Sequence, residues 1–173
     1  MSSIQAVTGE LPRTRPSVSR AAPPASRPRV LVAKEQPALR SLLGRTLREA
    51  GYDVTELDDG TALWNELRLL NEPGVVNDPY AEEVHQVHLI VSDARMHGLD
   101  GLEVLARLRA NEWGTPVILI SADGGRDLEV EGARLGAAAV FEQPLDLQAL
   151  VSAARALVDP ARWGDEAVGH LSV

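Results

Sequence analysis

The chain has 173 residues, of which 45% are hydrophobic and 24% are charged, and its formal net charge is -8. These values are typical of a globular domain and exclude a wholly disordered or fibrous chain. The chain has no cysteine, which excludes a disulfide framework, a thiolate metal site and a cysteine nucleophile.

The charge is distributed unevenly along the chain. Residues 1–29 carry five arginines and one acid, whereas residues 30–173 carry 12 basic residues against 24 acids. An acidic body repels phosphate backbones, which argues against nucleic acid as a partner. No apolar run is long enough to span a membrane, and the N-terminus lacks the apolar core of a secretory signal. We therefore expect a cytoplasmic protein without membrane contact.

The order of apolar runs and helical stripes predicts the elements. Residues 1–28 combine five prolines with Ser, Thr, Ala and Arg, which predicts a disordered basic Pro/Arg-rich leader that is dispensable for folding. Apolar runs then predict strands at 29–33, 52–57, 87–92, 116–120 and 138–141. Between and after them, apolar stripes at helical spacing predict helices that begin near Pro37, Ala62, Gly101, Leu128 and Leu147.

Two further segments do not follow this alternation of strands and helices. Residues 71–86 are longer than the usual connection in such units and predict an inserted loop. Residues 159–173 predict a C-terminal tail. The alternation over residues 29–158 predicts one α/β domain, a doubly wound five-stranded parallel sheet built from five βα units, (βα)5.

Polar residues follow the predicted strands at their carboxyl ends, where an open parallel sheet places its functional crevice. These residues are Lys34, Glu35, Ser92, Asp93, Ser121 and Gln143. A carboxylate at such an end can serve as a nucleophile or a metal ligand, and it can equally cap a loop. The spacing alone leaves both roles open for Asp93.

Residues 29–158 resemble the response-regulator receiver domain, a CheY-like family of two-component signal transduction. The segments that carry the resemblance are Val30–Arg40, Leu89–Gly101, Pro116–Ala122 and Gly136–Pro144. The resemblance implies a flavodoxin-like, CheY-like (βα)5 fold. It also implies that Asp93 is the phosphoacceptor position and that Ser121 is the switch hydroxyl.

Three positions depart from the pattern of that family. The acidic pair is Lys34-Glu35, so that a cation replaces its first carboxylate. The phosphate-binding lysine is Gln143. The aromatic switch position is Val140, and Phe141 lies one residue further on and therefore points to the other face of the strand.

These departures change what the site is expected to bind. The resemblance implies that a Mg²⁺ ion would use Glu35, Asp93 and the backbone of Arg95, but the ammonium of Lys34 predicts weak binding. We expect Lys34, the only lysine of the chain, to take the place of the metal by pairing with Asp93 or Glu35. We expect no other cofactor. His97 stands where the family commonly has a proline, and we expect it to be a surface-loop residue.

Two functional classes remain open. The first is a pseudo-receiver, a phosphorylation-independent adaptor for protein–protein interaction. The alternative is a stand-alone response regulator in a phosphorelay, whose Asp93 accepts phosphate from a histidine kinase. Signalling proteins would bind the face formed by the helix at 128–135, the strand at 138–141 and the last helix; a histidine kinase and a homodimer are the other partners considered.

We expect no enzyme. A haloacid-dehalogenase-type enzyme needs a second acid two residues after its aspartate, and that position is Arg95. A dinucleotide-binding enzyme needs a glycine-rich turn after its first strand, and residues 34–37 contain no glycine.

Overall fold

A computed structural model describes residues 27–70, 86–123 and 125–161. Nearly all of the predicted leader, inserted loop and C-terminal tail lies outside these residues. The strands of the described part are β1 (Arg29–Ala33), β2 (Asp53–Leu57), β3 (Leu89–Asp93), β4 (Val117–Ser121) and β5 (Ala139–Glu142). Its helices are α1 (Pro37–Glu49), α2 (Gly60–Leu70), α4 (Gly101–Ala110), α5 (Arg126–Leu135) and α6 (Leu147–Leu157).

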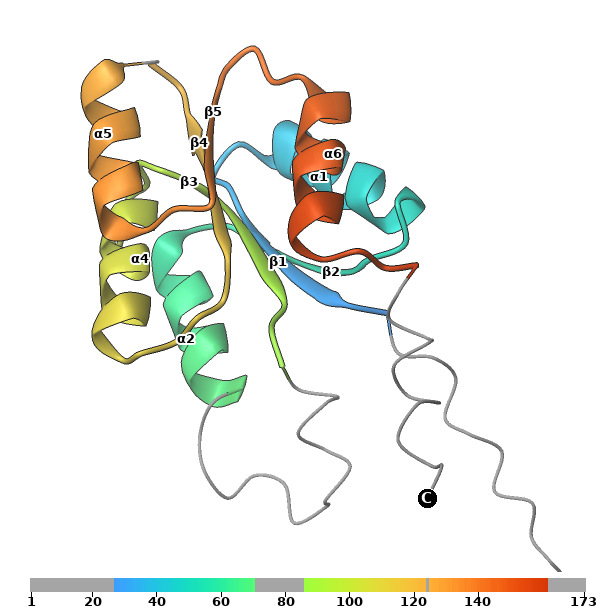
Figure 1. Ribbon diagram of the computed structural model, residues 1–173, viewed down its shortest axis with the longest axis horizontal. Helices are drawn as coiled ribbons and strands as arrows, with labels where there is room; N and C mark the ends of the chain where they lie inside the picture. Colours follow the sequence, from blue (N-terminus) through green and yellow to red (C-terminus); the bar gives the residue numbers. More distant parts are fainter. Residues whose placement is uncertain (1–26, 71–85, 124, 162–173) are drawn as a thin grey trace, which may run out of the picture.

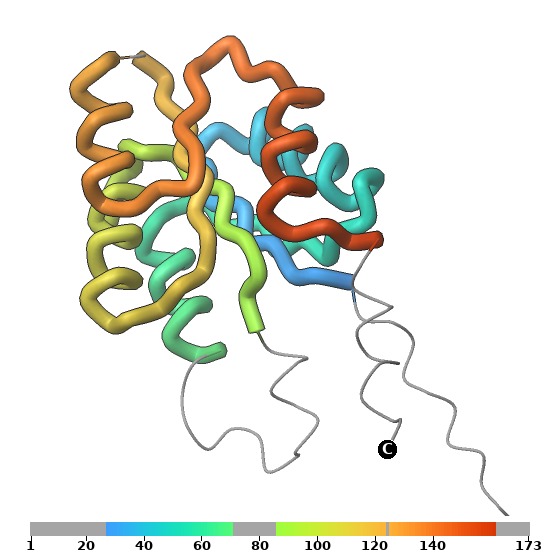
Figure 2. Tube along the Cα trace, viewed as in Figure 1, coloured from blue at the N-terminus to red at the C-terminus, as the bar shows by residue number. Residues whose placement is uncertain are grey.

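The strands form one parallel sheet in the order β2-β1-β3-β4-β5. Helices α1 and α6 cover one face, and α2, α4 and α5 cover the other (Figure 1). The path of the chain from β1 outward to β2, and then back across the sheet to β5, can be followed in Figure 2. This arrangement confirms the predicted doubly wound, flavodoxin-like fold.

Alternate residues of each strand face the two helical layers. Val30 and Val32 pack with α1 and α6, whereas Leu31 and Ala33 pack with α2 and α4. The central strands are therefore buried on both faces, which explains their continuous apolar runs. In the edge strand β5, Val140 packs on the side of α2, α4 and α5, and Phe141 packs on the side of α1 and α6. The two side chains therefore point to opposite faces of the sheet, as predicted.

The helix ends follow local sequence signals. Asp100 caps α4 and forms a reciprocal capping box with Glu103. Asp146 caps α6 through two backbone N–H groups, and Gly136 ends α5 in the left-handed region, with φ of 87°. Within the described residues, none of the helices combines the length and apolar character that crossing a membrane requires.

Strands β2, β3, β4 and β5 each begin one or two residues later than the sequence predicts. Before β2 and β3, the preceding residues make other contacts. The N–H of Tyr52 donates to the carbonyl of Leu47 at 3.1 Å and closes α1, and its hydroxyl donates to the carbonyl of Val158 at 2.6 Å. His88 makes two hydrogen bonds with Arg29. Its backbone N–H donates to the carbonyl of Arg29 at 2.9 Å, and its ring Nδ1 accepts from the backbone N–H of Arg29 at 3.0 Å. Regular pairing therefore starts at Asp53 in β2 and at Leu89 in β3.

Arg109 joins the end of α4 to the end of α5. Its guanidinium donates to the carbonyl of Trp113 at 2.7 Å, to that of Thr115 at 3.2 Å and to that of Gly136 at 3.0 Å. A planar fork of donors suits this task, because it can bind several acceptors at once. This contact fixes the loop that leads into β4.

Candidate functional site

The carboxyl ends of β1, β3, β4 and β5 bring five of the predicted residues to one edge of the sheet. We call Lys34, Glu35, Asp93, Ser121 and Gln143 the strand-end site. Lys34 follows β1 and is 3% exposed, and Ser121 ends β4 and is 6% exposed. Asp93 ends β3, and its side chain is 13% exposed. The site is thus built on paired strands and is largely covered.

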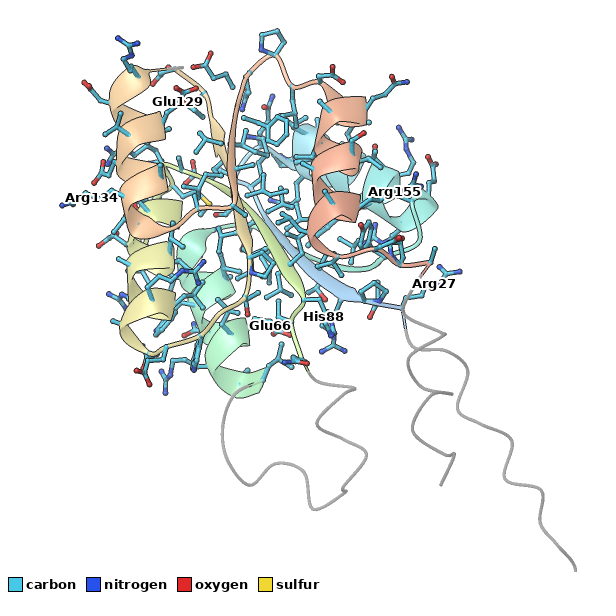
Figure 3. The ribbon with its side chains drawn as sticks, viewed as in Figure 1. Arg27, Glu66, His88, Glu129, Arg134 and Arg155 are labelled. Atoms are coloured by element: carbon cyan, nitrogen blue, oxygen red, sulfur yellow. The ribbon has the colours of Figure 1, made fainter. Side chains whose placement is uncertain are left out.

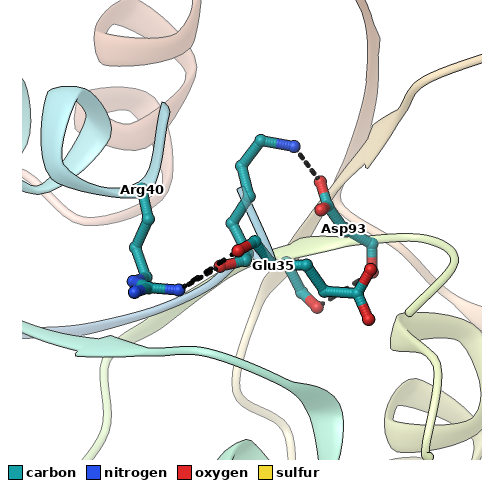
Figure 4. A network of polar contacts seen from close by, with 5 residues as sticks. Glu35, Arg40 and Asp93 are labelled. Atoms are coloured by element: carbon teal, nitrogen blue, oxygen red, sulfur yellow. Dashed lines mark hydrogen bonds and ion pairs between the residues drawn. The ribbon is translucent and has the colours of Figure 1, made fainter. Parts of the chain in front are cut away.

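The ammonium of Lys34 lies on the carboxylate of Asp93. Its Nζ is 2.6 Å from Oδ1 of Asp93. On the other side of the chain, Arg40 of α1 donates to the carbonyl of Lys34 at 2.7 Å, and both contacts are drawn in Figure 4. The backbone of Lys34 is also tied to β2, because its N–H donates to the carbonyl of Leu57 at 3.1 Å. The cation is therefore held from its backbone as well as from its side chain.

Burial and hydrogen bonding act on Asp93 in opposite directions. Burial raises the pKa of Asp93 above its ordinary value, because a charged carboxylate loses hydration there. The Lys34 ammonium and the backbone N–H of Glu35 lower the pKa of Asp93 in part. The ammonium is thus the main group that compensates a carboxylate at this depth.

Glu35 points its carboxylate at the loop after β3 rather than at Asp93. Its Oε1 accepts two hydrogen bonds from one residue, the backbone N–H of His97 at 2.5 Å and Nδ1 of the His97 ring at 2.6 Å. These two hydrogen bonds, the backbone one first, lower the pKa of Glu35 below its ordinary value. His97 itself is a surface residue, as predicted, with a side chain that is 96% exposed.

The strand-end site in this arrangement does not fit a divalent cation. A hard cation needs several free oxygen ligands, but one oxygen of Asp93 carries the ammonium and one oxygen of Glu35 carries two N–H donors. Within the described part of the chain, no three His, Asp or Glu side chains form a group that could hold a metal ion.

Ser121 ends β4, Gln143 follows β5, and Val140 lies within β5. The carbonyl of Ser121 accepts a hydrogen bond from the backbone N–H of Gln143 at 3.0 Å, which joins the ends of β4 and β5. Val140 is half-buried, and its side chain lies against Gly132 of α5, where an added Cβ would come within 3.1 Å of it. An aliphatic side chain therefore packs at the position of the family's movable ring.

Strand β5 lies at the edge of the sheet with α5 on one side and α6 on the other (Figure 1). We call the outer side of these three elements the α5–β5–α6 face. Figure 3 labels the exposed Glu129 and Arg134 on α5 and Arg155 on α6. Two apolar side chains of the same helices are also exposed, Val130 of α5 at 63% and Leu157 of α6 at 39%. The face thus combines apolar side chains with charges of both signs.

Sequence reasoning missed two contacts of the site. It did not connect His97 with Glu35, and it gave no role to Arg40. The pairing of β1 with β3 places the loops after these strands side by side, which is a signal that the two loops meet. The backbone donors that decide the contact, however, are not visible in a residue pattern.

Comparison with known proteins identifies the kind of domain. Residues 30–155 match the family model of the response regulator receiver domain. The receiver domain of the Francisella response regulator 1452 superposes with a TM-score of 0.62 at 25% identity, over 75% of this chain and 95% of that one.

Curated relatives are longer than this chain. The C4-dicarboxylate transport transcriptional regulatory protein DctD of Pseudomonas aeruginosa is 35% identical over 133 residues, which are 77% of this chain and 26% of that protein. The transcriptional regulatory protein FixJ of Bradyrhizobium diazoefficiens is 32% identical over 135 residues, which are 76% of this chain and 58% of that protein. The similarity therefore covers only part of each relative.

Proposed function

Because this chain belongs to the response regulator receiver domain family, we propose that it is a pseudo-receiver, an adaptor for protein–protein interaction that works without phosphorylation. The ion pair between Lys34 and Asp93 is the observation that carries this proposal. A phosphate-driven switch needs two states that make different contacts. Here one oxygen of the carboxylate that would be phosphorylated or would bind a cation already has an internal, covered partner.

The charges at the site support the same conclusion. Phosphoryl transfer brings further negative charge onto a carboxylate, so the site must supply cations to the phosphoryl oxygens. The formal charges of Glu35, Asp93 and Lys34 sum to -1. The ammonium of Lys34 is already paired with Asp93 and is not available to phosphoryl oxygens. Gln143 can donate a hydrogen bond but adds no charge. We accordingly propose no enzymatic activity and no resident cofactor for this domain.

In this proposal the α5–β5–α6 face is the surface that signalling proteins bind. Val130 and Leu157 provide exposed apolar contacts at two places on it. Val140 packs inward against α5, so that the shape of the face does not depend on a ring that moves. The proposed surface is therefore constitutive.

The second candidate is a response regulator that a histidine kinase phosphorylates at Asp93. It is favoured by the geometry of two residues, because Asp93 ends β3 and Ser121 ends the neighbouring β4. In this case a phosphorylated donor would have to displace Lys34 from the carboxylate. The two candidates differ in chemistry that can be measured directly.

Labelling with acetyl phosphate distinguishes the two functions. We expect the native protein to give no phosphorylated Asp93 by intact-mass measurement, with or without Mg²⁺. Lys34→Asp combined with Gln143→Lys rebuilds the family's charge pattern and should raise labelling above that of the native protein. Stoichiometric labelling of the native protein in Mg²⁺ would refute the pseudo-receiver and support the second candidate.

Partner binding tests the proposed surface. Proteins that co-purify with the native chain should be retained by Asp93→Ala and lost by Val130→Asp, which places a charge at an exposed apolar position of α5. Loss of every partner in Asp93→Ala would instead show that binding depends on the phosphoacceptor.

A further inference from the structure

His97 makes an unusual pair of contacts with Glu35. Its backbone N–H and its ring Nδ1 both donate to the same oxygen, Oε1, at 2.5 and 2.6 Å. Hydrogen bonds to an ionised acceptor are among the stronger ones in proteins. Two such donors from one residue hold the carboxylate at a defined position, even though the ring itself is exposed.

The loop that carries His97 is fixed by its own contacts. Gly98 has φ of 74° and lies beside Thr61 of α2, and the carbonyl of Leu99 packs directly against Gly60, leaving no space for a Cβ there. Asp100, the next residue, caps α4. Because contacts with α2 and α4 set the position of this loop, they hold the donors of His97 in place independently of Glu35.

The contact of Glu35 is separate from that of Lys34. The ammonium binds Asp93, and His97 binds Glu35. Replacing Lys34 therefore frees Asp93 but leaves the other carboxylate turned toward the loop. A cation entering the site would still lack one of its two side-chain ligands.

We propose that His97 is a positioning residue that holds Glu35 on the loop after β3 and so closes the strand-end site to divalent cations independently of Lys34. This inference rests on the proposed function, in which the site is not phosphorylated and binds no divalent cation. It adds a second cause for the lack of cation binding. It implies that reversing Lys34 alone restores cation binding only in part.

Titration calorimetry with Mg²⁺ tests the inference. The proteins compared are the native chain, Lys34→Asp, and Lys34→Asp combined with His97→Pro, His97→Ala or His97→Asn. Proline removes both donors, alanine removes only the ring, and asparagine offers an amide N–H near the place of Nδ1. Lys34→Asp with Arg48→Ala is the control, because it breaks an exposed ion pair of α1 with Glu56 away from the site.

We expect Lys34→Asp/His97→Pro to bind Mg²⁺ about 10-fold more tightly than Lys34→Asp, which is the size typical of groups that orient metal ligands. His97→Ala should give a smaller gain, and His97→Asn and the Arg48→Ala control should give none. Thermal unfolding of each variant checks its fold. If the proline variant does not fold, the comparison of alanine with asparagine carries the test.

Two results would overturn parts of this picture, and they are distinguishable. If Lys34→Asp binds Mg²⁺ as tightly as its combinations with His97→Pro and His97→Ala, His97 does not position Glu35, and the proposed function stands. If the native chain binds Mg²⁺ as tightly as those double variants, the site is not closed at all, and the proposed function fails with the inference.

Discussion

Replacing Lys34 with methionine should destabilise the protein strongly, because it leaves the carboxylate of Asp93 buried without a cation. Methionine keeps most of the apolar stem and removes the ammonium that lies 2.6 Å from Oδ1. Removing one partner of a buried ion pair costs about 3–5 kcal/mol. The side chain of Asp93 keeps 13% of its exposure, so that some hydration compensates, and we expect a loss near the lower end, about 3 kcal/mol.

Chemical denaturation of four proteins measures this loss. They are the native chain, Lys34→Met, Asp93→Asn and the double variant. Asparagine is nearly isosteric with aspartate but carries no charge, so the methionine should cost much less in its presence. The difference between the two costs is the coupling energy of the pair. In thermal unfolding, Lys34→Met should lower the midpoint by about 10 °C.

The cost of Lys34→Met should also depend on pH. Burial already raises the pKa of Asp93 in the native protein, and loss of the ammonium removes the strongest group that lowers it. A raised pKa in the folded state means that stability is complete when the carboxyl is protonated and is lost as the pH rises through that pKa. The deficit of the variant should therefore be largest at neutral pH and shrink in acid. A cost below about 0.5 kcal/mol, the range of ordinary surface substitutions, or a cost that does not change with pH, would refute this account of the pair.

Two further predictions concern contacts far from Asp93. Burial raises the pKa of Tyr52 to about 12, so its contribution to stability is complete below about pH 10 and is lost as the pH approaches 12. Tyr52→Phe should cost about 1 kcal/mol at neutral pH through the lost hydrogen bond and should weaken the alkaline loss in a denaturation series; an unchanged profile would contradict this. Arg109→Ala leaves three carbonyl oxygens without their donor and should cost about 2 kcal/mol in urea unfolding, whereas Arg134→Ala on exposed α5 should cost almost nothing.

The sequence predicts the fold well because burial on two faces leaves a strong pattern. Runs such as Leu89–Val91 and Val117–Ile120 are typical of strands that are covered on both faces of a parallel sheet. The ends of the strands are less predictable. Tyr52 and His88 look like strand residues, but each makes a side-chain contact with a distant part of the chain that interrupts regular pairing.

The candidate site divides in the same way. The position of each polar residue after its strand predicts that Lys34 pairs with Asp93 or Glu35. The register of β1 and β3, which only the structure shows, brings Lys34 to Asp93. The direction of Glu35 could not be predicted, because it depends on how α2 and α4 hold the loop of His97. Close approaches such as that of Leu99 to Gly60 decide the path of this loop, and they exist only once the helices are packed.

The hydroxyl of Tyr52 has a consequence for the engineering of this domain. By binding the carbonyl of Val158 it holds the end of α6 beside the start of β2, and the neighbouring Asp53 N–H donates to the carbonyl of Pro28. The first and last described segments therefore lie side by side at the amino ends of the strands. Asp93 lies at the opposite, carboxyl ends of the strands. A short linker joining Arg27 to Ala161 would therefore lie away from the strand-end site and would allow a circular permutant to be opened elsewhere.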